Sequence, residues 1–383
     1  MQAIYYYGSD YKHYLILMAK TVFILGAGAS FKAGVPLMSN FLDEAKKLLL
    51  SGNLTSEDET HFQRVFRGIS ALQGIHSKSK LDINNLESVF ATFEMAQRLN
   101  KMPLFESEEI PLLIKSMKRL IVVTIEQHLI FPVKDSQINL PDPYFSFGKM
   151  IHELIQNPKI DHNVSILTFN YDLAADLMAQ KFDLGPDYSL PNSTSYGSKK
   201  VLKLLKLHGS INWGVTKDHE RVRPYNLKDF LGTKGFTSMS KTILNVGTEM
   251  KNFERVKYHE EPVIIPPTWN KSNIHPDMNA VWQQAALELE HAENLFVIGF
   301  SLPETDIFFR HLYALGTIGK IPFNRFWVFD PDESGIVEQR YSELLGPGAI
   351  NRFKFYKKTF EQAVEMLNEE FVVNSGKHKF FTP

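Results

Sequence analysis

A short apolar run that ends in a glycine turn constrains the fold of this chain most strongly. The run is Thr21–Leu25, and the turn that follows is Gly26-Ala27-Gly28-Ala29-Ser30. A buried strand that leads through a tight glycine turn into a helix is typical of nucleotide-binding α/β folds, where backbone N–H groups approach a pyrophosphate. A pair of glycines can also serve only to make a tight turn. The pattern predicts a nucleotide site and leaves the nucleotide open.

Four further strand patterns follow, and helical patterns separate most of them. The strand patterns are Val164–Phe169, Val201–Leu207, Leu295–Ile298 and Phe326–Phe329. This alternation predicts an α/β protein with a doubly wound, mostly parallel Rossmann-like sheet. Residues 55–157 show helical periodicity without strand signals, so we expect an all-helical insertion there. The expected domains are an N-terminal extension (1–17), the Rossmann-like domain (18–54 and 158–383) and the helical insertion (55–157), with a loop-rich excursion at 214–262 and a closing helix at 359–372.

Small or hydrogen-bonding residues follow all five predicted strands. In an open parallel sheet the carboxyl ends of the strands share one edge, and ligands bind there. The residues at these five ends are Gly26 and Gly28, Asn170-Tyr171-Asp172, His208-Gly209-Ser210, Gly299-Phe300-Ser301 and Asp330-Pro331-Asp332. Together they predict a nucleotide crevice with catalytic side chains.

Most of these residues also have a purely structural interpretation. Asn170 suits a turn, and Asp172 suits the cap of the helix that starts near Leu173, which is the favoured interpretation for Asp172. His208 suits a buried structural histidine, and Ser30 and Ser210 suit a cap and a turn. Asp330 suits an exposed turn, although a carboxylate at a strand end also commonly binds a ribose diol.

Composition excludes several classes of site. The 383 residues include no cysteine, so disulfides, thiolate zinc sites and cysteine nucleophiles are excluded. The formal net charge of −1 gives no overall attraction to nucleic acid or to anionic lipid. Residues 1–20 lack the basic start and the cleavage site of a signal peptide, and no stretch is long enough to span a membrane. We therefore expect a cytoplasmic protein.

The glycine pattern departs from that of dehydrogenases. It reads Gly-x-Gly-x-Ser, and no acidic residue follows a second strand about twenty residues later. Hydride transfer is therefore disfavoured.

Four motifs in order resemble the sirtuin-like superfamily. They are Gly26–Ser30 with Ala33-Gly34-Val35-Pro36, then Thr168–Asp172, then Leu207–Ser210, then Gly299–Ser301. The resemblance implies that NAD is the substrate, that Gly26, Gly28 and Ser30 contact its pyrophosphate, that Asn170 lines the nicotinamide pocket and that His208 is the catalytic base. It also implies that Gly299 and Ser301 approach the adenosine half and that Asp330 approaches its ribose. The expected catalytic residues are Asn170 and His208, no metal is expected, and the expected NAD-binding residues are Gly26, Ala27, Gly28, Ser30, Pro36, Thr168, Asp172, Gly209, Ser210, Gly299, Phe300, Ser301 and Asp330.

The chain departs from the pattern of one group within this superfamily. Protein-deacylating sirtuins carry a four-cysteine zinc module, which this chain cannot build. Two of the motifs are similar in sequence to those of bacterial sirtuin-like proteins of antiphage defence. They are Thr168–Asp172 and Leu207–Trp213, and Ile265-Pro266-Pro267 lies downstream of them. This implies an NAD⁺ hydrolase that depletes NAD in abortive infection, acts as a homo-oligomer and assembles with a HerA-type ring ATPase. The alternatives are a protein deacylase or ADP-ribosyltransferase, and a non-catalytic scaffold that senses NAD or ADP-ribose.

Overall fold

The computed structural model describes most of the chain. The described residues are 20–74, 81–134, 137–156, 163–191, 200–225, 227, 240–243, 246–248, 257–266, 275–304, 306–319 and 321–373. The predicted N-terminal extension, residues 1–17, lies outside them.

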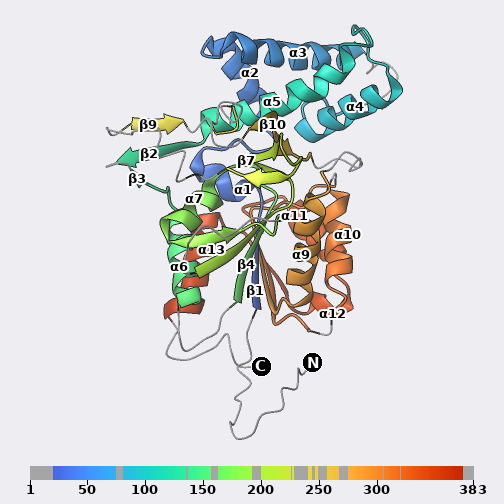
Figure 1. Cartoon of the computed structure of the whole chain (residues 1–383). Coiled ribbons are helices and arrows are strands. Elements are labelled where there is room, and N and C mark those ends of the chain that lie inside the picture. Colours follow the sequence, from blue (N-terminus) through green and yellow to red (C-terminus); the bar gives the residue numbers. More distant parts are fainter. Residues whose placement is uncertain are drawn as a thin grey trace, which may run out of the picture.

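A seven-stranded sheet, entirely parallel in the described residues, forms the centre of the molecule (Figure 1). Its strands are β1 (Lys20–Leu25), β4 (Asn163–Thr168), β5 (Leu184–Asp187), β6 (Lys200–Lys206), β11 (Asn294–Ile298), β12 (Arg325–Phe329) and β13 (Phe353–Tyr356). Their order is β13-β12-β11-β1-β4-β6-β5. The predicted parallel, doubly wound sheet is confirmed, and all five predicted strands are present.

The inner strands form because their residues are apolar on both faces. Residues 22–25 of β1 and all of β11 are buried, as parallel strands covered by helices on both sides must be. The sheet order runs outward in both directions from the β1–β11 pair, so this pair is the topological switch point, where open α/β sheets bind ligands.

Helices cover both faces of the sheet. In Figure 1, α6, α7 and α13 lie on one side, and α9 and α10 lie on the other. The bounds are α6 (Tyr144–Gln156), α7 (Ala174–Lys181), α9 (Met278–Glu290), α10 (Ile307–Gly316), α11 (Ile336–Leu344), α12 (Pro347–Ile350) and α13 (Phe360–Asn368), which continues into a π-helical turn at Glu369–Val373. The capping box of Thr359 and Gln362 starts α13, so the predicted closing helix is present.

Further helices lie over the carboxyl ends of the strands (Figure 1). After the short turns α1 (Ala27–Ser30) and η1 (Phe31–Ala33) come α2 (Phe41–Ser51), α3 (Ser56–Gln73), α4 (Leu86–Leu99) and α5 (Ile110–His128). Thr55 caps α3 by accepting the N–H of Asp58, and Asn85 caps α4 by accepting the N–H groups of Glu87 and Ser88. The helical insertion therefore covers the edge of the sheet at which ligands bind.

The prediction that residues 55–157 are all helical is wrong at 130–138. There β2 (Ile130–Lys134) and β3 (Gln137–Ile138) form a small antiparallel sheet with β9 (Ser240–Ile243). The partner strand is about a hundred residues away in sequence, so local periodicity cannot reveal the pairing. Helix α6 packs against β4 and α7, as a layer of the sheet domain would. The predicted domain boundary at residue 157 stays a prediction.

The excursion at 214–262 also contains strands. A third sheet, in the order β10-β7-β8, joins β7 (Gly209–Thr216), β8 (Val222–Pro224) and β10 (Tyr258–Ile264) in antiparallel pairs. The chain passes from β6 of the parallel sheet into β7 of this sheet through Leu207 and His208. Within the described residues, no helix combines the length and apolar character that crossing a membrane requires.

Candidate functional site

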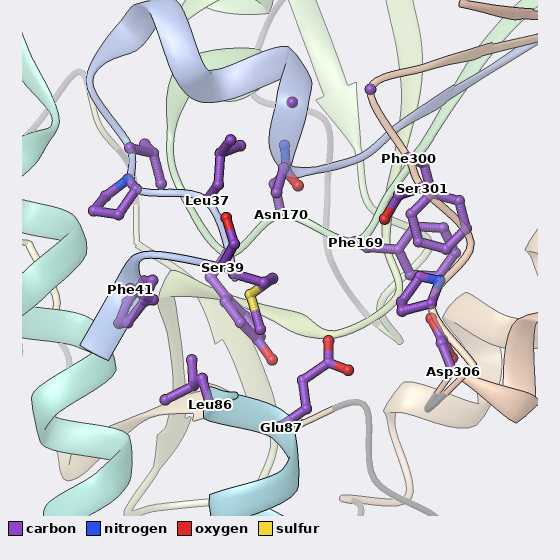
Figure 2. Close-up of a pocket in the computed structure, with 18 of the residues that line it drawn as sticks. Leu37, Ser39, Phe41, Leu86, Glu87, Phe169, Asn170, Phe300, Ser301 and Asp306 are labelled. Carbon is purple, nitrogen blue, oxygen red and sulfur yellow. The ribbon is translucent and has the colours of Figure 1, made fainter. Parts of the chain in front are cut away.

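A cavity of about 450 Å³ lies at the carboxyl ends of the parallel strands, under the insertion (Figure 2). This volume is within the range of small-molecule and cofactor sites, about 300–1,000 Å³. Residues that follow β1, β4, β6, β11 and β12 line it, and these are adjacent strands. Five adjacent strands at about 4.8 Å spacing span about 19 Å, so the cavity suits an elongated ligand.

Two glycine loops meet at the switch point. A Cβ atom at Gly26 would lie 2.5 Å from the Gly299 carbonyl oxygen, and one at Gly299 would lie 2.5 Å from the Ala29 nitrogen. Gly299 also has a left-handed φ of 61°, and the N–H of Gly28 donates to its carbonyl at 2.9 Å. The close approach of these two backbone segments explains the glycines without a ligand, so glycine alone does not identify a phosphate site.

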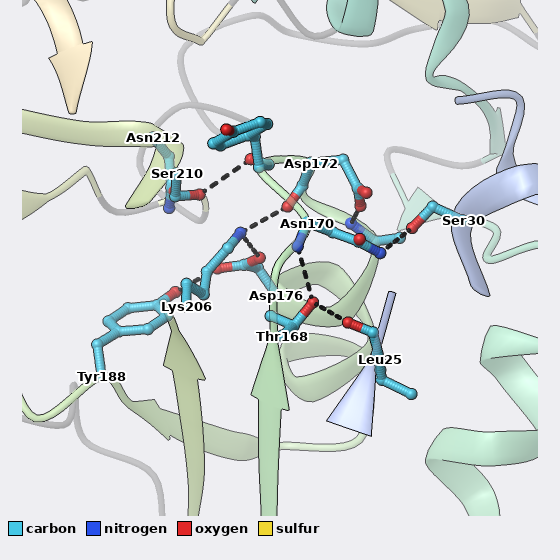
Figure 3. A network of polar contacts seen from close by, with 12 residues as sticks. Leu25, Ser30, Thr168, Asn170, Asp172, Asp176, Tyr188, Lys206, Ser210 and Asn212 are labelled. Carbon is cyan, nitrogen blue, oxygen red and sulfur yellow. Dashed lines mark hydrogen bonds and ion pairs between the residues drawn. The ribbon is translucent and has the colours of Figure 1, made fainter. Parts of the chain in front are cut away.

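Asn170 is held rigidly at the end of β4 (Figure 3). Its side-chain amide donates to the carbonyl of Gly26 at 2.8 Å and to Oγ of Ser30 at 3.0 Å. Its backbone N–H donates to Oγ1 of Thr168 at 3.1 Å, and that hydroxyl donates to the Leu25 carbonyl. Asn170 lines the cavity, whereas Ser30 and Thr168 lie behind it and fix its orientation. The ends of β1 and β4 are thereby joined through one carboxamide.

A buried ion pair supports the same loop. Lys206 and Asp176 are 0% and 1% exposed, and Nζ of Lys206 lies 2.7 Å from Oδ2 of Asp176. The ammonium also donates to the carbonyl of Asp172 at 2.5 Å, and the hydroxyl of Tyr188 donates to Asp176 at 2.6 Å. This network holds the backbone of Asp172 against the sheet (Figure 3).

Asp172 itself has a structural contact and a place in the cavity wall. Its carboxylate accepts the N–H of Ala174 at 2.8 Å and so supports the first turn of α7, but the N-cap of this helix is Leu173 and not, as predicted, Asp172, because the helix begins one residue later. Burial raises the pKa of the Asp172 carboxyl, while the Lys206 ammonium and a hydrogen bond from Ser30 oppose that shift. The same side chain lines the cavity.

His208 lies where the chain leaves the parallel sheet. The residue is 3% exposed, and its ring stacks near Tyr171 and packs edge to face with Phe169. Nε2 of His208 lies 3.8 Å from Oδ2 of Asp306. Asp306 also caps α10 by accepting the N–H of Phe309 at 3.3 Å. An imidazole and a carboxylate thus face each other in the wall of the cavity.

Further residues after β11 and β12 complete the wall of the cavity. Phe300 stacks on Phe169 with ring centroids 4.2 Å apart, which makes an aromatic wall. Nη1 of Arg340, on α11, donates to the Ser301 carbonyl at 3.3 Å. Burial raises the pKa of the nearby cavity residue Asp330, and the N–H of Asp332, which donates to its carboxylate at 3.0 Å, opposes the shift.

Most of the predicted site residues lie together. Those that line the cavity are Ala27, Gly28, Pro36, Asn170, Asp172, His208, Gly299, Phe300, Ser301 and Asp330. The remaining predicted residues lie outside its lining, in the strands and turns behind it: Gly26, Ser30, Thr168, Gly209 and Ser210. Gly209 has a left-handed φ of 80° and begins β7, and Ser210 donates to the Tyr171 carbonyl at 3.2 Å.

A second set of residues also lines the cavity. They are Val35, Leu37, Met38, Ser39, Phe41, Asn85, Leu86, Glu87, Ile125, Phe169, Tyr171, Pro303, Asp306, Pro331 and Arg340. Val35, Phe169, Tyr171 and Pro331 lie within the quoted motifs or strand ends but were not expected to contact the ligand, and the others were missed. Those next to the quoted motifs could have been included by extending each motif. Nothing in the sequence of α4 or α5 indicates that Glu87 and Ile125 reach this cavity. Asp306 is the N-cap of α10 in the structure, and its contact with His208 has no sequence signal.

Comparisons with known proteins show that the chain is remotely similar to several solved structures. No protein-family model and no curated protein matches the chain. Among solved structures, the chain is similar to Sir2Tm bound to a propionylated peptide, with 14% identity, a TM-score of 0.36 and 92% of each chain covered. It is also similar to a mutant Sir2 homologue with 2′-O-acetyl ADP-ribose, at 12% identity, a TM-score of 0.39 and 94% of each chain covered. A mutant Sir2 homologue with ADP-ribose gives 12% identity and a TM-score of 0.39, over 95% of this chain and 96% of that chain. The fold assignment above depends on strand order and pairing, not on these similarities.

Proposed function

We propose that the cavity binds NAD⁺ and that the protein is a sirtuin-like NAD⁺ hydrolase, which releases nicotinamide and ADP-ribose. One observation carries the proposal: Asn170 and His208, far apart in the sequence, line one cavity with the glycine loops after β1 and β11. The order of the four motifs supports NAD⁺ as the ligand. The spread of the lining over five adjacent strands suits a dinucleotide in an extended conformation.

The proposed chemistry needs a base and does not need an acid. Nicotinamide leaves NAD⁺ as a neutral molecule, so its departure requires no protonation, in contrast to ordinary glycosides. Water adds to the anomeric carbon as the glycosidic bond breaks, and one proton is released. In this proposal His208 accepts that proton from the water or from a ribose hydroxyl, and Asn170 orients the ribose hydroxyls or the water.

Asp306 is the proposed positioning residue for His208. Its carboxylate faces Nε2 of the imidazole at 3.8 Å while its other oxygen caps α10, so its position is fixed by the helix. A carboxylate held next to an imidazole orients the ring and stabilises the imidazolium that forms on proton uptake.

The proposed cellular role is NAD depletion in antiphage defence. It depends on the resemblance of the Thr168–Asp172 and Leu207–Trp213 motifs to those of bacterial sirtuin-like defence proteins. An unregulated NAD⁺ hydrolase would kill its own cell, so we propose a low activity that homo-oligomerisation or a HerA-type ATPase raises. The insertion over the cavity is the proposed lid that excludes bulk water.

Product analysis tests the proposed reaction. Purified protein is incubated with NAD⁺ and an acylated peptide, alone and with the candidate ATPase, and the products are identified by mass spectrometry. We expect free nicotinamide and ADP-ribose in equal amounts. O-acyl-ADP-ribose would indicate a deacylase, and ADP-ribose linked to protein would indicate a transferase. Binding of NAD⁺ without release of nicotinamide, even in the assembled complex, would indicate a sensing scaffold.

A further inference from the structure

The insertion contributes a carboxylate to the cavity. Glu87 is the second residue of α4, and it is buried although it lies in the first turn of a helix that covers the sheet. Figure 2 shows its carboxylate pointing up into the cavity, with Asn170 above it in this view. Asn85 fixes the start of α4 by accepting two backbone N–H groups, at 2.9 and 3.1 Å. The position of the carboxylate is therefore set by a capped helix and not by a loop.

Carboxylates dominate the charge of the cavity wall, which includes Glu87, Asp172, Asp306 and Asp330. Glu87 and Asp306 are both close enough to Tyr171 that their negative charges, together with the larger effect of burial, raise the pKa of its hydroxyl. The end of the cavity next to Asn170, Tyr171 and His208 is therefore acidic. Among the described residues that line the cavity, the one lysine or arginine is Arg340. It lies at the Ser301 end, where the carboxylates of Asp330 and Glu304 also lie.

Carboxylates near Tyr171 suit a ligand that carries a positively charged ring. Building on the function proposed above, we propose that Glu87 is a specificity-determining residue that recognises the positively charged nicotinamide ring. A carboxylate in a partly desolvated cavity favours a cationic ring over the same ring in its neutral, reduced form, because attraction between opposite charges strengthens as water is excluded.

The proposal predicts discrimination between two ligands of almost identical shape. NAD⁺ and NADH differ mainly in the charge and planarity of the ring, and ADP-ribose lacks the ring. Removal of the Glu87 charge should weaken binding of the cationic ligand alone. Because the ring is cationic in the bound substrate before the bond breaks, the loss should appear in KM more than in kcat.

Calorimetry with three ligands tests this. The probes are carba-NAD⁺, whose carbocyclic ribose prevents hydrolysis, NADH and ADP-ribose, titrated into the wild-type protein and into Glu87→Gln. We expect Glu87→Gln to lose affinity for carba-NAD⁺ by about tenfold or more, which is about 1.4 kcal/mol. Its affinities for NADH and ADP-ribose should stay within about twofold.

The matched control is Glu57→Gln. Glu57 is the second residue of α3, as Glu87 is of α4, but it is exposed and does not line the cavity. Its variant should bind all three ligands as the wild type does. An unchanged preference for carba-NAD⁺ in Glu87→Gln would overturn the proposal, and so would an equal loss for all three ligands. A wild-type protein that prefers carba-NAD⁺ but releases no nicotinamide would refute hydrolysis and leave the role of Glu87 standing.

Discussion

The Lys206–Asp176 ion pair gives the sharpest prediction about what holds the site together. Lys206→Met removes an ammonium that lies 2.7 Å from a carboxylate, with both side chains almost fully buried. Asp176 then keeps the hydrogen bond from Tyr188 and loses its counter-charge. Removing one partner of a buried ion pair costs about 3–5 kcal/mol, so we expect a loss of this size in the free energy of unfolding. With an m-value of about 3 kcal/mol/M, the urea midpoint falls by about 1 M or more.

A double-mutant cycle isolates the pair. Asp176→Asn removes the charge and still accepts the hydroxyl of Tyr188, so Lys206→Met with Asp176→Asn leaves no unpaired charge at this pair, while the buried Asp172 carboxyl loses the Lys206 ammonium in both variants. We expect the double variant to recover at least about 2 kcal/mol of the loss in Lys206→Met. The assay is urea denaturation followed by tryptophan fluorescence. A cost below about 1 kcal/mol for the single variant, or no recovery in the double variant, would refute the reasoning.

Three further predictions concern separate features. Gly299→Ala should lower the free energy of unfolding by at least about 2 kcal/mol more than Gly52→Ala does. Both glycines have a left-handed φ, but of the two only Gly299 would bring its new Cβ against backbone, 2.5 Å from the Ala29 nitrogen. Equal urea midpoints for the two variants would contradict this. Burial raises the pKa of the Glu126 carboxyl to about 8. Relative to Glu126→Gln, the wild type should therefore lose stability as the pH rises from about 4.5 to about 8. Urea midpoints of both proteins at pH 5 and pH 8 test this, and a difference between the proteins that is the same at both pH values would count against it. Asp306→Asn keeps a cap for α10 and should lower kcat for nicotinamide release about tenfold at an unchanged urea midpoint; an unchanged kcat would remove Asp306 from the mechanism.

The inner part of the fold could be predicted because its residues are buried on both faces. Strands such as β1 and β11 are apolar runs followed by glycine, so both the strand and its carboxyl end could be recognised in the sequence. The edge strands β5 and β13 were missed. Gly185 and Pro186 interrupt β5, and β13 is only partly buried, so neither reads as a continuous apolar run.

The candidate site could be predicted only in the part that strand ends provide. Asn170, His208 and Asp330 were found because parallel strands bring their carboxyl ends to one edge. Glu87 could not be found this way, since its place in the cavity depends on how α4 packs over the sheet. The same holds for Asp306, whose role as a helix cap is local but whose contact with His208 is not.

The rate of nicotinamide release tests the central claim most directly. The wild type, Asn170→Ala and His208→Ala are compared at saturating NAD⁺ in the assembly that is most active, with His219→Ala as the control because His219 is exposed and does not line the cavity. We predict that the two cavity variants lose about a hundredfold or more in kcat and that the control keeps the wild-type rate. Release of nicotinamide by His208→Ala at the wild-type rate would contradict the account.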